Sequence, residues 1–238
     1  RFFTAKDGYL LVDADYSQIE LRVLAHISGD EIMKKAFLDG VDIHTVTASQ
    51  VFNQPIEWVT PDLRSKAKAV NFGIVYGIGA FSLSKDIGVS VSKASEYIRS
   101  YLSKYSGIAH YMEQTVAKAK RDGYVETMFG RRRYIKELAA KNKNLQAFGE
   151  RVAKNTPIQG TAADIIKIAM IKVYNRLEES GLDARLILQV HDELIVEAKE
   201  DCAEKVALLL KEEMENAVKL TVPMTVDVNI GKTWYDTH

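Results

Sequence analysis

The sequence predicts an α+β fold in which an antiparallel sheet with flanking helices is interrupted by a mostly helical domain. Residues 9–12, 185–198 and 224–230 are rich in β-prone residues, and the later two stretches alternate apolar and polar side chains. From residue 30 to about residue 143 the pattern is helical, with breaks at glycine and asparagine. We therefore expect a sheet domain at 1–29 and 145–238, and a helical domain at 30–144.

The sheet domain begins with a strand at residues 9–12, which leads into an acidic turn at Asp13–Asp15 and a helix over residues 19–27. After the helical insert, a long helix is expected over about residues 145–177, with a kink at Pro157 because proline lacks a backbone N–H. Two strands, 185–190 and 194–198, follow as a hairpin whose tip is His191–Glu193. A helix at about 201–218 and a strand at 224–230 complete the prediction.

Composition narrows the class of protein. The 238 residues carry 32 basic and 32 acidic side chains, so net charge gives no argument for a nucleic-acid partner. Locally, the segment from Lys118 to Lys143 contains nine basic residues and only three acidic ones. A single cysteine excludes an intrachain disulfide and a cysteine-rich zinc site, which indicates an intracellular protein. No apolar run could span a bilayer, and a start at Arg1 without methionine indicates a piece of a longer chain.

A strip of four residues at helical spacing stands out in the helical insert. Arg64, Lys68, Phe72 and Tyr76 follow one another at intervals of four, so a helix would present two cations and then two aromatic rings on one face. This order suits a ligand with phosphates at one end and a sugar or base at the other, such as a nucleotide. The alternative is a solvated charged face beside core aromatics, which the same spacing also produces.

Carboxylates at the ends of predicted strands form the second candidate site. Asp15 ends the first strand, and Asp192 and Glu193 lie at the hairpin tip. Carboxylates at the ends of neighbouring strands repel one another unless a cation lies between them, and Mg²⁺ typically uses one or two carboxylates plus substrate phosphates. The alternative is that acids at turns cap the backbone and stay solvated. Of the histidines, His191 is the one expected in a site; the isolated His26, His44 and His110 are expected to be structural or surface residues.

Three segments together resemble a known family. DADYSQIELR at residues 13–22, RSKAKAVNFGIVYG at 64–77 and QVHDELIVE at 189–197 resemble motifs A, B and C of family A DNA polymerases, in order and approximate spacing. ERVAKNTPIQGTAADIIKIAM at 150–170 resembles the long palm helix of that family, and the GKTWYDTH ending resembles its C-terminus. The resemblance implies that the sheet domain is the palm and that residues 30–144 are the fingers.

The resemblance also implies catalytic roles. Asp15 and Asp192 would be ligands of two magnesium ions, which manganese could replace, with help from the Tyr16 carbonyl and with Glu193 close by. Arg64 and Lys68 would hold the phosphates of an incoming dNTP, and Lys68 would give a proton to the departing pyrophosphate.

Further residues would contact the nucleotide. Phe72 would pack beside the sugar, and a ring without a hydroxyl resembles family members that discriminate strongly against dideoxynucleotides. Tyr76 would stack near the templating position, and Glu20 would exclude a 2′-hydroxyl. Gln18 and His191 would also lie at the nucleotide.

The implied activity is magnesium-dependent, DNA-templated DNA synthesis by a bacterial cytoplasmic, nucleoid-associated monomer. The implied partners are primer–template DNA, dNTP and the upstream part of the same polypeptide, with no membrane. Arg151, Asn155, Gln159 and His191 would contact primer and template, and Arg131 would lie by template phosphate. Because only residues 1–10 precede the first motif, the thumb and the exonuclease-like domain are missing, and we expect weak DNA binding and poor or no activity from these residues alone.

Two other functions share some of these features. Single-subunit RNA polymerases have similar acids, the paired Arg and Lys, and the tyrosine, but Glu20 and the Phe72-Gly73 pair argue against this class. A non-catalytic nucleic-acid-binding fragment is the second alternative. The intact acids Asp15, Asp192 and Glu193 argue against it.

Overall fold

The computed structural model describes residues 2–237, and the chain divides into two compact units. The first, called here the sheet unit, consists of residues up to 19 and from 162 onward. The second, called here the helical unit, spans Glu20–Thr161. The units meet at residues 19/20 and 161/162, whereas the domain boundaries predicted from sequence lie at 29/30 and 144/145. Helix α8 (Lys143–Ser180) is continuous across the second of these junctions.

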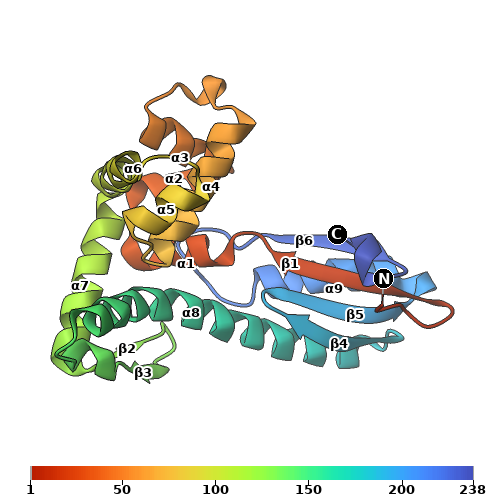
Figure 1. The fold of residues 1–238 in the computed structure, drawn as a ribbon. Coiled ribbons are helices and arrows are strands. Elements are labelled where there is room, and N and C mark those ends of the chain that lie inside the picture. Colours follow the sequence, from red (N-terminus) through yellow and green to blue (C-terminus); the bar gives the residue numbers. More distant parts are fainter. Residues whose placement is uncertain (1, 238) are drawn as a thin grey trace. The chain divides into compact units, whose positions relative to one another are not determined.

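The sheet unit is built on four strands in the order β4-β5-β1-β6, and every neighbouring pair is antiparallel (Figure 1). The strands are β1 (Tyr9–Tyr16), β4 (Ala184–Val190), β5 (Glu193–Lys199) and β6 (Val226–Gly231). The predicted α+β class with an antiparallel sheet and flanking helices is confirmed. Because β1 lies between β5 and β6, residues from both ends of the chain meet on one sheet.

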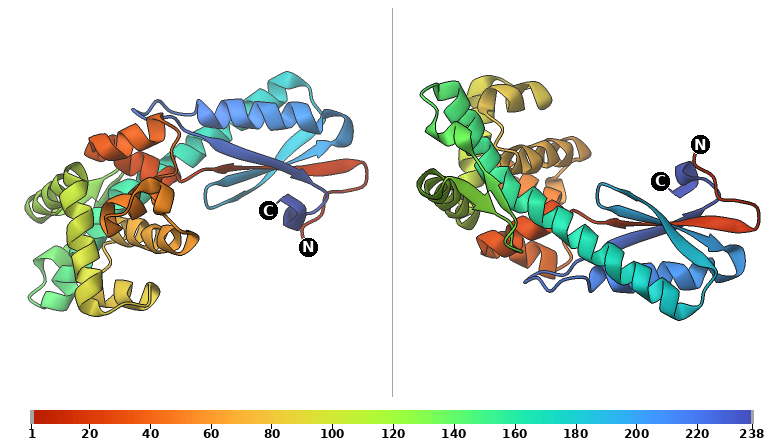
Figure 2. Two further views of the ribbon diagram at one scale, coloured as in Figure 1. Left: turned by 90° about the horizontal axis from the view of Figure 1, so that it is seen from above. Right: turned by 90° about the horizontal axis from the view of Figure 1, so that it is seen from below.

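Helix α9 (Ala203–Glu215) packs against one face of this sheet (Figure 2). The Tyr16 hydroxyl donates a 2.6 Å hydrogen bond to the Met214 carbonyl at the end of α9, so the buried residues Val12, Ala14 and Tyr16 point toward that helix. Side chains alternate along a strand, which directs Asp13 and Asp15 to the opposite face. The acids of β1 therefore lie on the face that α9 does not cover.

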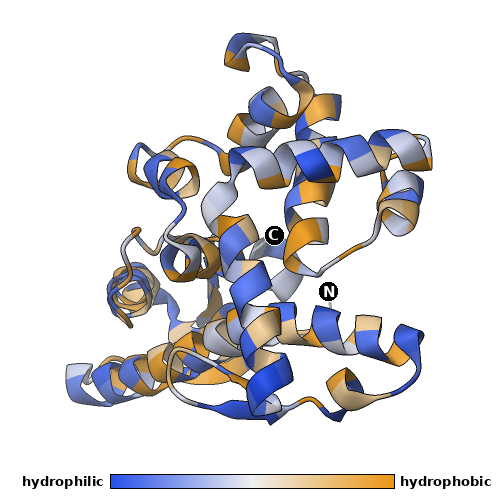
Figure 3. Cartoon of the chain, turned by 90° about the vertical axis from the view of Figure 1, so that its left-hand side faces the viewer, coloured by the Kyte–Doolittle hydropathy of each residue, from blue (hydrophilic) through white to orange (hydrophobic). Residues whose placement is uncertain are grey.

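The helical unit contains short helices joined by tight turns, and hydrophobic and hydrophilic residues alternate along them (Figure 3). Asp30, Asp42, Thr60 and Ser90 each occupy an N-cap and accept a hydrogen bond from a backbone N–H three residues later. The helices are α1 (Ile19–Ser28), α2 (Glu31–Leu38), α3 (Ile43–Phe52), α4 (Pro61–Val75), α5 (Ala80–Asp86), α6 (Val91–Lys104) and α7 (Ser106–Asp122), with 3₁₀ turns at Ile56–Trp58 and Lys136–Ala139.

One part of the predicted helical insert is not helical. Residues Tyr124–Glu126 and Arg132–Tyr134 form a two-stranded hairpin, β2-β3, whose connecting loop is closed by a hydrogen bond from the Thr127 N–H to the Arg131 carbonyl. Gly130 has a φ of +79°, a conformation that favours glycine. Three-residue strands are too short to show a period of two, so the sequence pattern gave no sign of the hairpin.

Smaller differences concern where elements begin and end. The predicted acidic turn at Asp13–Asp15 is wrong, because β1 continues through Tyr16 and both acids are paired in the sheet. Helix α8 runs through Pro157 to Ser180, and α9 is shorter than predicted. Among the described residues, no helix is long and apolar enough to cross a membrane.

Candidate active site

Strand register brings three carboxylates into one row on the sheet face opposite α9. Asp15 on β1 lies directly opposite Glu193 on β5 and, on its other side, opposite Asp227 on β6. Asp15 and Asp227 are exposed to solvent, whereas Glu193 retains 8% of its surface. Like charges directly opposite one another in a sheet repel, which makes this row a candidate position for a cation.

The turn between β4 and β5 presents the fourth acid. Val190 pairs with Glu193, which leaves His191 and Asp192 as a two-residue turn, and His191 has a φ of +47°. Two-residue hairpin turns require such a conformation, which a non-glycine residue adopts at some cost in free energy. The Tyr16 N–H donates a 3.2 Å hydrogen bond to the Asp192 carbonyl, which ties this turn to the end of β1.

Partial burial raises the pKa of the Asp192 carboxyl above its ordinary value, and a backbone hydrogen bond and the nearby His191 oppose the shift only in part. A carboxyl that is disfavoured as an anion gains from a bound cation. The neighbouring Asp13 differs, because its Oδ2 accepts a 3.0 Å hydrogen bond from the Thr237 hydroxyl and the side chain is buried. Asp13 is therefore a structural carboxylate, and Asp15 and Asp192 are the better ligand candidates.

The predicted strip lies along α4 of the helical unit. Thr60 caps this helix and Pro61 occupies its first turn, which suits proline because the N–H it lacks would have no helical partner. Arg64, Lys68 and Tyr76 are exposed and Phe72 is half-buried. The helix's core-facing side is occupied by Ala67, Val70, Asn71, Ile74 and Val75.

The two cations of the strip are held differently. Arg64 forms a two-point ion pair with Asp42, with Nε at 2.8 Å from Oδ2 and a terminal nitrogen at 3.0 Å from Oδ1. Burial would raise the pKa of the Asp42 carboxyl, but hydrogen bonds from Arg64 and Thr45 outweigh it and hold the pKa well below its usual range. Lys68 makes no salt bridge with any described residue. Arg64 is thus oriented before a ligand arrives, and the Lys68 ammonium is available to an anion.

The aromatic end of the strip is fixed by its neighbours. The Phe72 and Tyr76 rings are nearly parallel, with centroids 6.3 Å apart, and His44 contacts the Phe72 ring at 5.8 Å. Asn155 of α8 donates a 3.1 Å hydrogen bond to the Tyr76 carbonyl, where α4 ends. The next residue, Gly77, has a φ of +65° and packs so closely on Arg151 that a Cβ would lie 3.1 Å from Cγ of that arginine.

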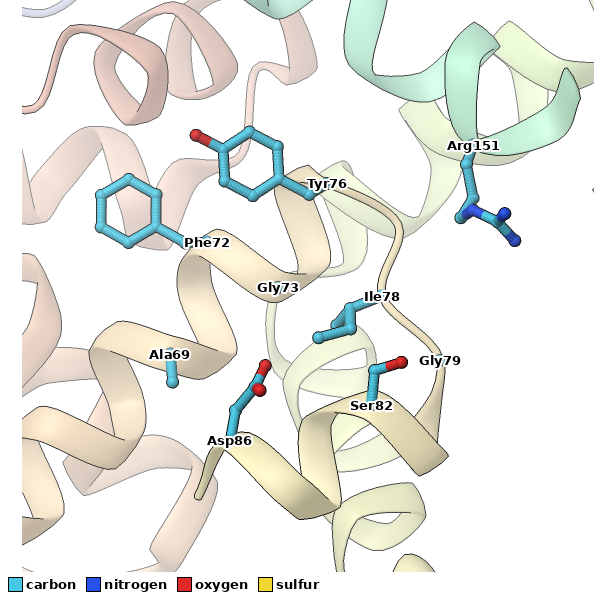
Figure 4. A pocket seen from close by; sticks show the side chains of 9 residues that line it. All are labelled: Ala69, Phe72, Gly73, Tyr76, Ile78, Gly79, Ser82, Asp86 and Arg151. Atoms are coloured by element: carbon cyan, nitrogen blue, oxygen red, sulfur yellow. The ribbon is translucent and has the colours of Figure 1, made fainter. Parts of the chain in front are cut away.

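A pocket of about 530 Å³ opens beside these rings. Its lining includes Phe72 and Gly73 of α4, Tyr76 directly after this helix, and Ser82 and Asp86 of α5; the Phe72 and Tyr76 rings point away from the two α5 residues (Figure 4). A Cβ on Gly73 would approach the side chain of Ile78 to 2.5 Å, so a larger residue at that position would displace the pocket wall. Ile78, Gly79, Ser82 and Asp86 were not predicted as site residues, although the Gly-Ile-Gly break after α4 was a signal that a close approach occurs there.

The predicted DNA-contacting residues are all in the helical unit. Arg151 and Gln159 of α8 are exposed. Arg131 donates a 2.8 Å hydrogen bond to the Gly160 carbonyl, and a Cβ on Gly160 would lie 2.6 Å from the Thr127 methyl, so the β2-β3 hairpin docks closely on α8. The exposed basic loop is therefore held at one position along this helix.

The predicted site residues divide between the two units. Those of the sheet unit are Asp15, Tyr16, Gln18, His191, Asp192 and Glu193; those of the helical unit are Glu20, Arg64, Lys68, Phe72, Tyr76, Arg131, Arg151, Asn155 and Gln159. Like His191, Gln18 is a non-glycine residue with positive φ, at +57°. Such conformations are concentrated at functional sites. Sequence reasoning missed Asp227 and Asp42, and only the alternation of β6 and the N-cap pattern of α3 point to them.

No group of three or more histidine, cysteine, aspartate or glutamate side chains among the described residues is arranged to hold a metal ion. This does not conflict with a magnesium site, because Mg²⁺ in nucleotide-dependent enzymes uses one or two carboxylates and completes its shell with water and substrate phosphates. Two carboxylates are what Asp15 and Asp192 offer, and the raised pKa of Asp192 fits a cation-binding position.

The fold and these sites define a class of protein. The family model for DNA polymerase family A matches residues 1–236, and the chain belongs to this family. It is 52% identical to DNA polymerase I of Caldicellulosiruptor bescii over 237 residues, which are 100% of this chain and 28% of that protein. It is 50% identical over 234 residues to the thermostable DNA polymerase I of Thermus aquaticus, covering 98% of this chain and 28% of that protein.

A solved structure is similar to nearly the whole of this chain. The chain is similar to the POL domain of Pol1 from M. smegmatis in complex with DNA primer-template and dNTP, with a TM-score of 0.94 and 42% identity. The match covers 98% of this chain and 41% of that one. The chain therefore spans between a quarter and a third of the length of the curated relatives that it matches.

Proposed function

We propose that this chain supplies the nucleotidyl-transfer portion of a DNA-templated DNA polymerase. The reaction joins the primer 3′-oxygen to the α-phosphorus of a dNTP, breaks the bond to the departing pyrophosphate and adds one nucleotide to the primer. The observation that carries the proposal is the strip on α4, whose cations and rings are accessible while the opposite side of the helix is buried. The bound DNA and dNTP of the M. smegmatis relative support it.

The carboxylates of the sheet unit would hold the metal. Asp15 and Asp192, with the Tyr16 carbonyl, would bind two magnesium ions, or manganese in their place. Bound there, the ions would lower the pKa of the primer hydroxyl and neutralise charge on the phosphates. The Tyr16 side chain is occupied by its bond to Met214, which leaves its backbone carbonyl for this role. Glu193 would lie close to the metals and add negative charge.

The cations of α4 would bind the triphosphate. Arg64, aligned by Asp42, suits a two-point contact with phosphate oxygens, and Lys68 would act as a point charge and proton donor to the leaving pyrophosphate. Phosphate and Asp42 would then share or compete for one guanidinium. Nucleotide binding is therefore expected to weaken the Arg64–Asp42 ion pair.

The rings and nearby side chains would test the nucleotide. Phe72 would lie against the sugar and discriminate against dideoxynucleotides, and Glu20 would exclude a 2′-hydroxyl. Tyr76, which lines the pocket between α4 and α5, would stack near the templating base. Gln18 and His191 would complete the nucleotide contacts. Both have positive φ, so their side-chain directions are set by a constrained backbone.

Primer and template would contact the outer side of the helical unit. Arg151, Asn155 and Gln159 lie on successive turns of α8, which would follow the duplex, and Gln159 would read minor-groove acceptors common to all base pairs. Arg131, on the hairpin that docks against this helix, would lie by template phosphate. The domain names palm, for 1–29 and 145–238, and fingers, for 30–144, belong to this proposal.

A chimera tests the function directly. The chain would replace the 237 matching residues of the C. bescii DNA polymerase I, so that the remaining domains of a relative are present. We expect primer extension that requires Mg²⁺ and template, and a loss of about a thousandfold or more in Asp192→Ala, because a ligand of the reacting centre is removed.

The matched control is Asp13→Asn, which changes a nearby buried carboxylate that contacts Thr237. Asp13→Asn should change the stability of the chimera more than it changes the rate of primer extension by the folded chimera. The preference for dNTP over rNTP should fall in Glu20→Ala, and an rNTP preference in the wild-type chimera would favour an RNA polymerase instead. Extension by Asp192→Ala at the wild-type rate would overturn the proposal.

A further inference from the structure

A chain of four buried polar side chains lies behind Phe72 in the helical unit. His44 and Thr47 belong to α3, Asn71 belongs to α4, and Tyr105 precedes α7. Thr47, Asn71 and Tyr105 have no exposed surface and His44 retains 2%. Buried polar groups carry a free-energy cost unless each finds a partner, so such a chain requires a specific arrangement of hydrogen bonds.

The contacts define where each proton lies. The Thr47 hydroxyl donates to Asn71 Oδ1 at 3.0 Å, and since it has only one hydrogen, it must accept the 3.0 Å hydrogen bond from the Tyr105 hydroxyl. The Asn71 amide nitrogen, which can only donate, lies 3.0 Å from His44 Nδ1. Nδ1 must therefore be an acceptor, and a neutral imidazole then carries its proton on Nε2.

Charge around His44 favours the same state. Burial lowers the pKa of His44 to about 4; the carboxylate of Asp42 opposes this shift, and the cations Arg64 and Lys68 add to it. A proton on Nδ1 would also point at the amide hydrogens of Asn71. The Tyr105 hydroxyl, at the far end of the chain, also stays neutral because burial raises its pKa to about 12.

The same imidazole supports the aromatic part of the strip. The His44 ring lies 5.8 Å from the Phe72 ring at an angle of 42°, and Phe72 also stacks on Tyr76. The hydrogen bond to Nδ1 restricts rotation of the His44 ring, since rotation would break it. A fixed His44 ring limits the positions that Phe72 can take.

We propose that Asn71, Thr47 and Tyr105 are positioning residues, which hold His44 as the neutral Nε2–H tautomer with its ring against Phe72. Through that contact they place Phe72 for its test of the nucleotide sugar. The role in sugar selection rests on the proposed function. The assignment of the His44 tautomer does not rest on it, so the two are measured separately.

The tautomer is measured on the 238-residue chain labelled with ¹⁵N-histidine. Long-range ¹H–¹⁵N spectra distinguish protonated from bare ring nitrogens, and His44→Gln assigns the signal. We expect a protonated Nε2 and a bare Nδ1 from pH 8 down to about pH 5. In Asn71→Asp the new carboxylate would accept a hydrogen bond from a protonated Nδ1 and stabilise the imidazolium, so the His44 pKa should rise above its ordinary value. A wild-type Nδ1–H tautomer, or an unchanged pKa in Asn71→Asp, would overturn the assignment.

The role of these residues in sugar selection is measured in the chimera. The ratio of ddNTP to dNTP incorporation should rise roughly threefold to tenfold in Tyr105→Phe and Thr47→Val, the range that corresponds to loss of one hydrogen bond. Tyr101→Phe is the matched control. Tyr101 is equally buried and its ring lies 4.6 Å from that of Tyr105, but its hydroxyl has no hydrogen-bond partner among residues 2–237, so the ratio should stay at the wild-type value.

Each outcome has one meaning. An unchanged ratio in folded Tyr105→Phe and Thr47→Val overturns the role in sugar selection even if the spectra show the expected tautomer. An equal rise in Tyr101→Phe would mean general loosening of the core and would also overturn it. A chimera that makes no DNA overturns the proposed function and the role in sugar selection together, whereas the tautomer is still decided by the spectra.

Discussion

The sheet unit and the helical unit hold their candidate site residues in different ways. In the sheet unit, backbone pairing puts Asp15 directly between Glu193 and Asp227, so like charges are kept together. In the helical unit, side chains hold the site: Arg64 is paired with Asp42. We propose that a cation offsets this repulsion in the sheet unit, whereas Arg64 of the helical unit is held in place before a ligand arrives.

Function and stability are therefore expected to oppose each other in the sheet unit and to agree in the helical unit. Substitutions of the sheet-unit acids are expected to stabilise the chain without metal, since they remove repulsion or an unfavourable burial. Substitutions of the residues that hold the α4 strip are expected to destabilise it. Because the chain has two units, local stability is best measured by hydrogen exchange, which separates peptides of α3 and α4 from those of β1 and β5.

The largest expected effect is a pH dependence of the helical unit. The pKa of His44 is lowered in the folded state to about 4 from an ordinary 6.5, so the unfolded state takes up a proton first as the pH falls. The contribution of neutral His44 to the free energy of unfolding is therefore fully present above about pH 6.5 and is lost as the pH falls toward 4. Between pH 7 and 4.5 the wild type should lose about 2 kcal/mol more than His44→Gln. Equal losses in the two proteins would contradict this.

Removing the partner of Arg64 is expected to have the next largest effect. Asp42→Ala loses the N-cap of α3 and the two-point ion pair, a combined loss of about 1 to 2 kcal/mol in the free energy of unfolding. Asp62→Ala is the control, because its pair with Lys66 lies on an exposed helix face and contributes little. The comparison fails if urea unfolding shows the same loss for both variants.

A backbone substitution after α4 is expected to cost about 1 kcal/mol. Gly77→Ala would place a Cβ at a φ of +65° and against Arg151, whereas Gly79→Ala has a negative φ and no atom within 4 Å of its Cβ. Only the first should expose the end of α4 to hydrogen exchange. If both variants behave alike, the position of Tyr76 does not depend on this contact.

The smallest effect has the opposite sign and lies in the sheet unit. The raised pKa of Asp192 means that the unfolded state ionises first as the pH rises, so stability falls with increasing pH through the folded-state pKa. Asp192→Asn removes this titrating carboxyl and should raise the thermal midpoint at pH 7.5 without metal by roughly one or two degrees. A lower midpoint would show that the Asp192 carboxylate stabilises the sheet unit.

The two units also differ in how far the sequence could predict them. The strip on α4 followed from a spacing of four, and the β4-β5 hairpin from alternating residues, because local periodicity determines both. The partners Asp42, His44 and Asn155 come from other helices, and no local pattern indicates that they contact α4. His44 was expected to be an isolated structural or surface residue, but it is one end of a buried polar chain.

The pairing register of the sheet strands could not be predicted from the sequence either. Alternation on β6 shows which residues share a face, but it does not say that Asp227 lies opposite Asp15. The β2-β3 hairpin was missed because each strand has three residues. The positive φ of Gln18 and His191 could not be predicted either, since it depends on how the neighbouring strands hold those turns.

Calorimetric titration of the 238-residue chain with dNTP, with and without Mn²⁺, tests most directly the proposal that Asp192 and Lys68 both contribute to dNTP binding. We expect Mn²⁺ to tighten dNTP binding, Asp192→Asn to abolish this metal dependence, and Lys68→Ala to weaken binding while the metal dependence remains. Metal-independent binding by the wild type, or full metal dependence in Asp192→Asn, would contradict the proposal.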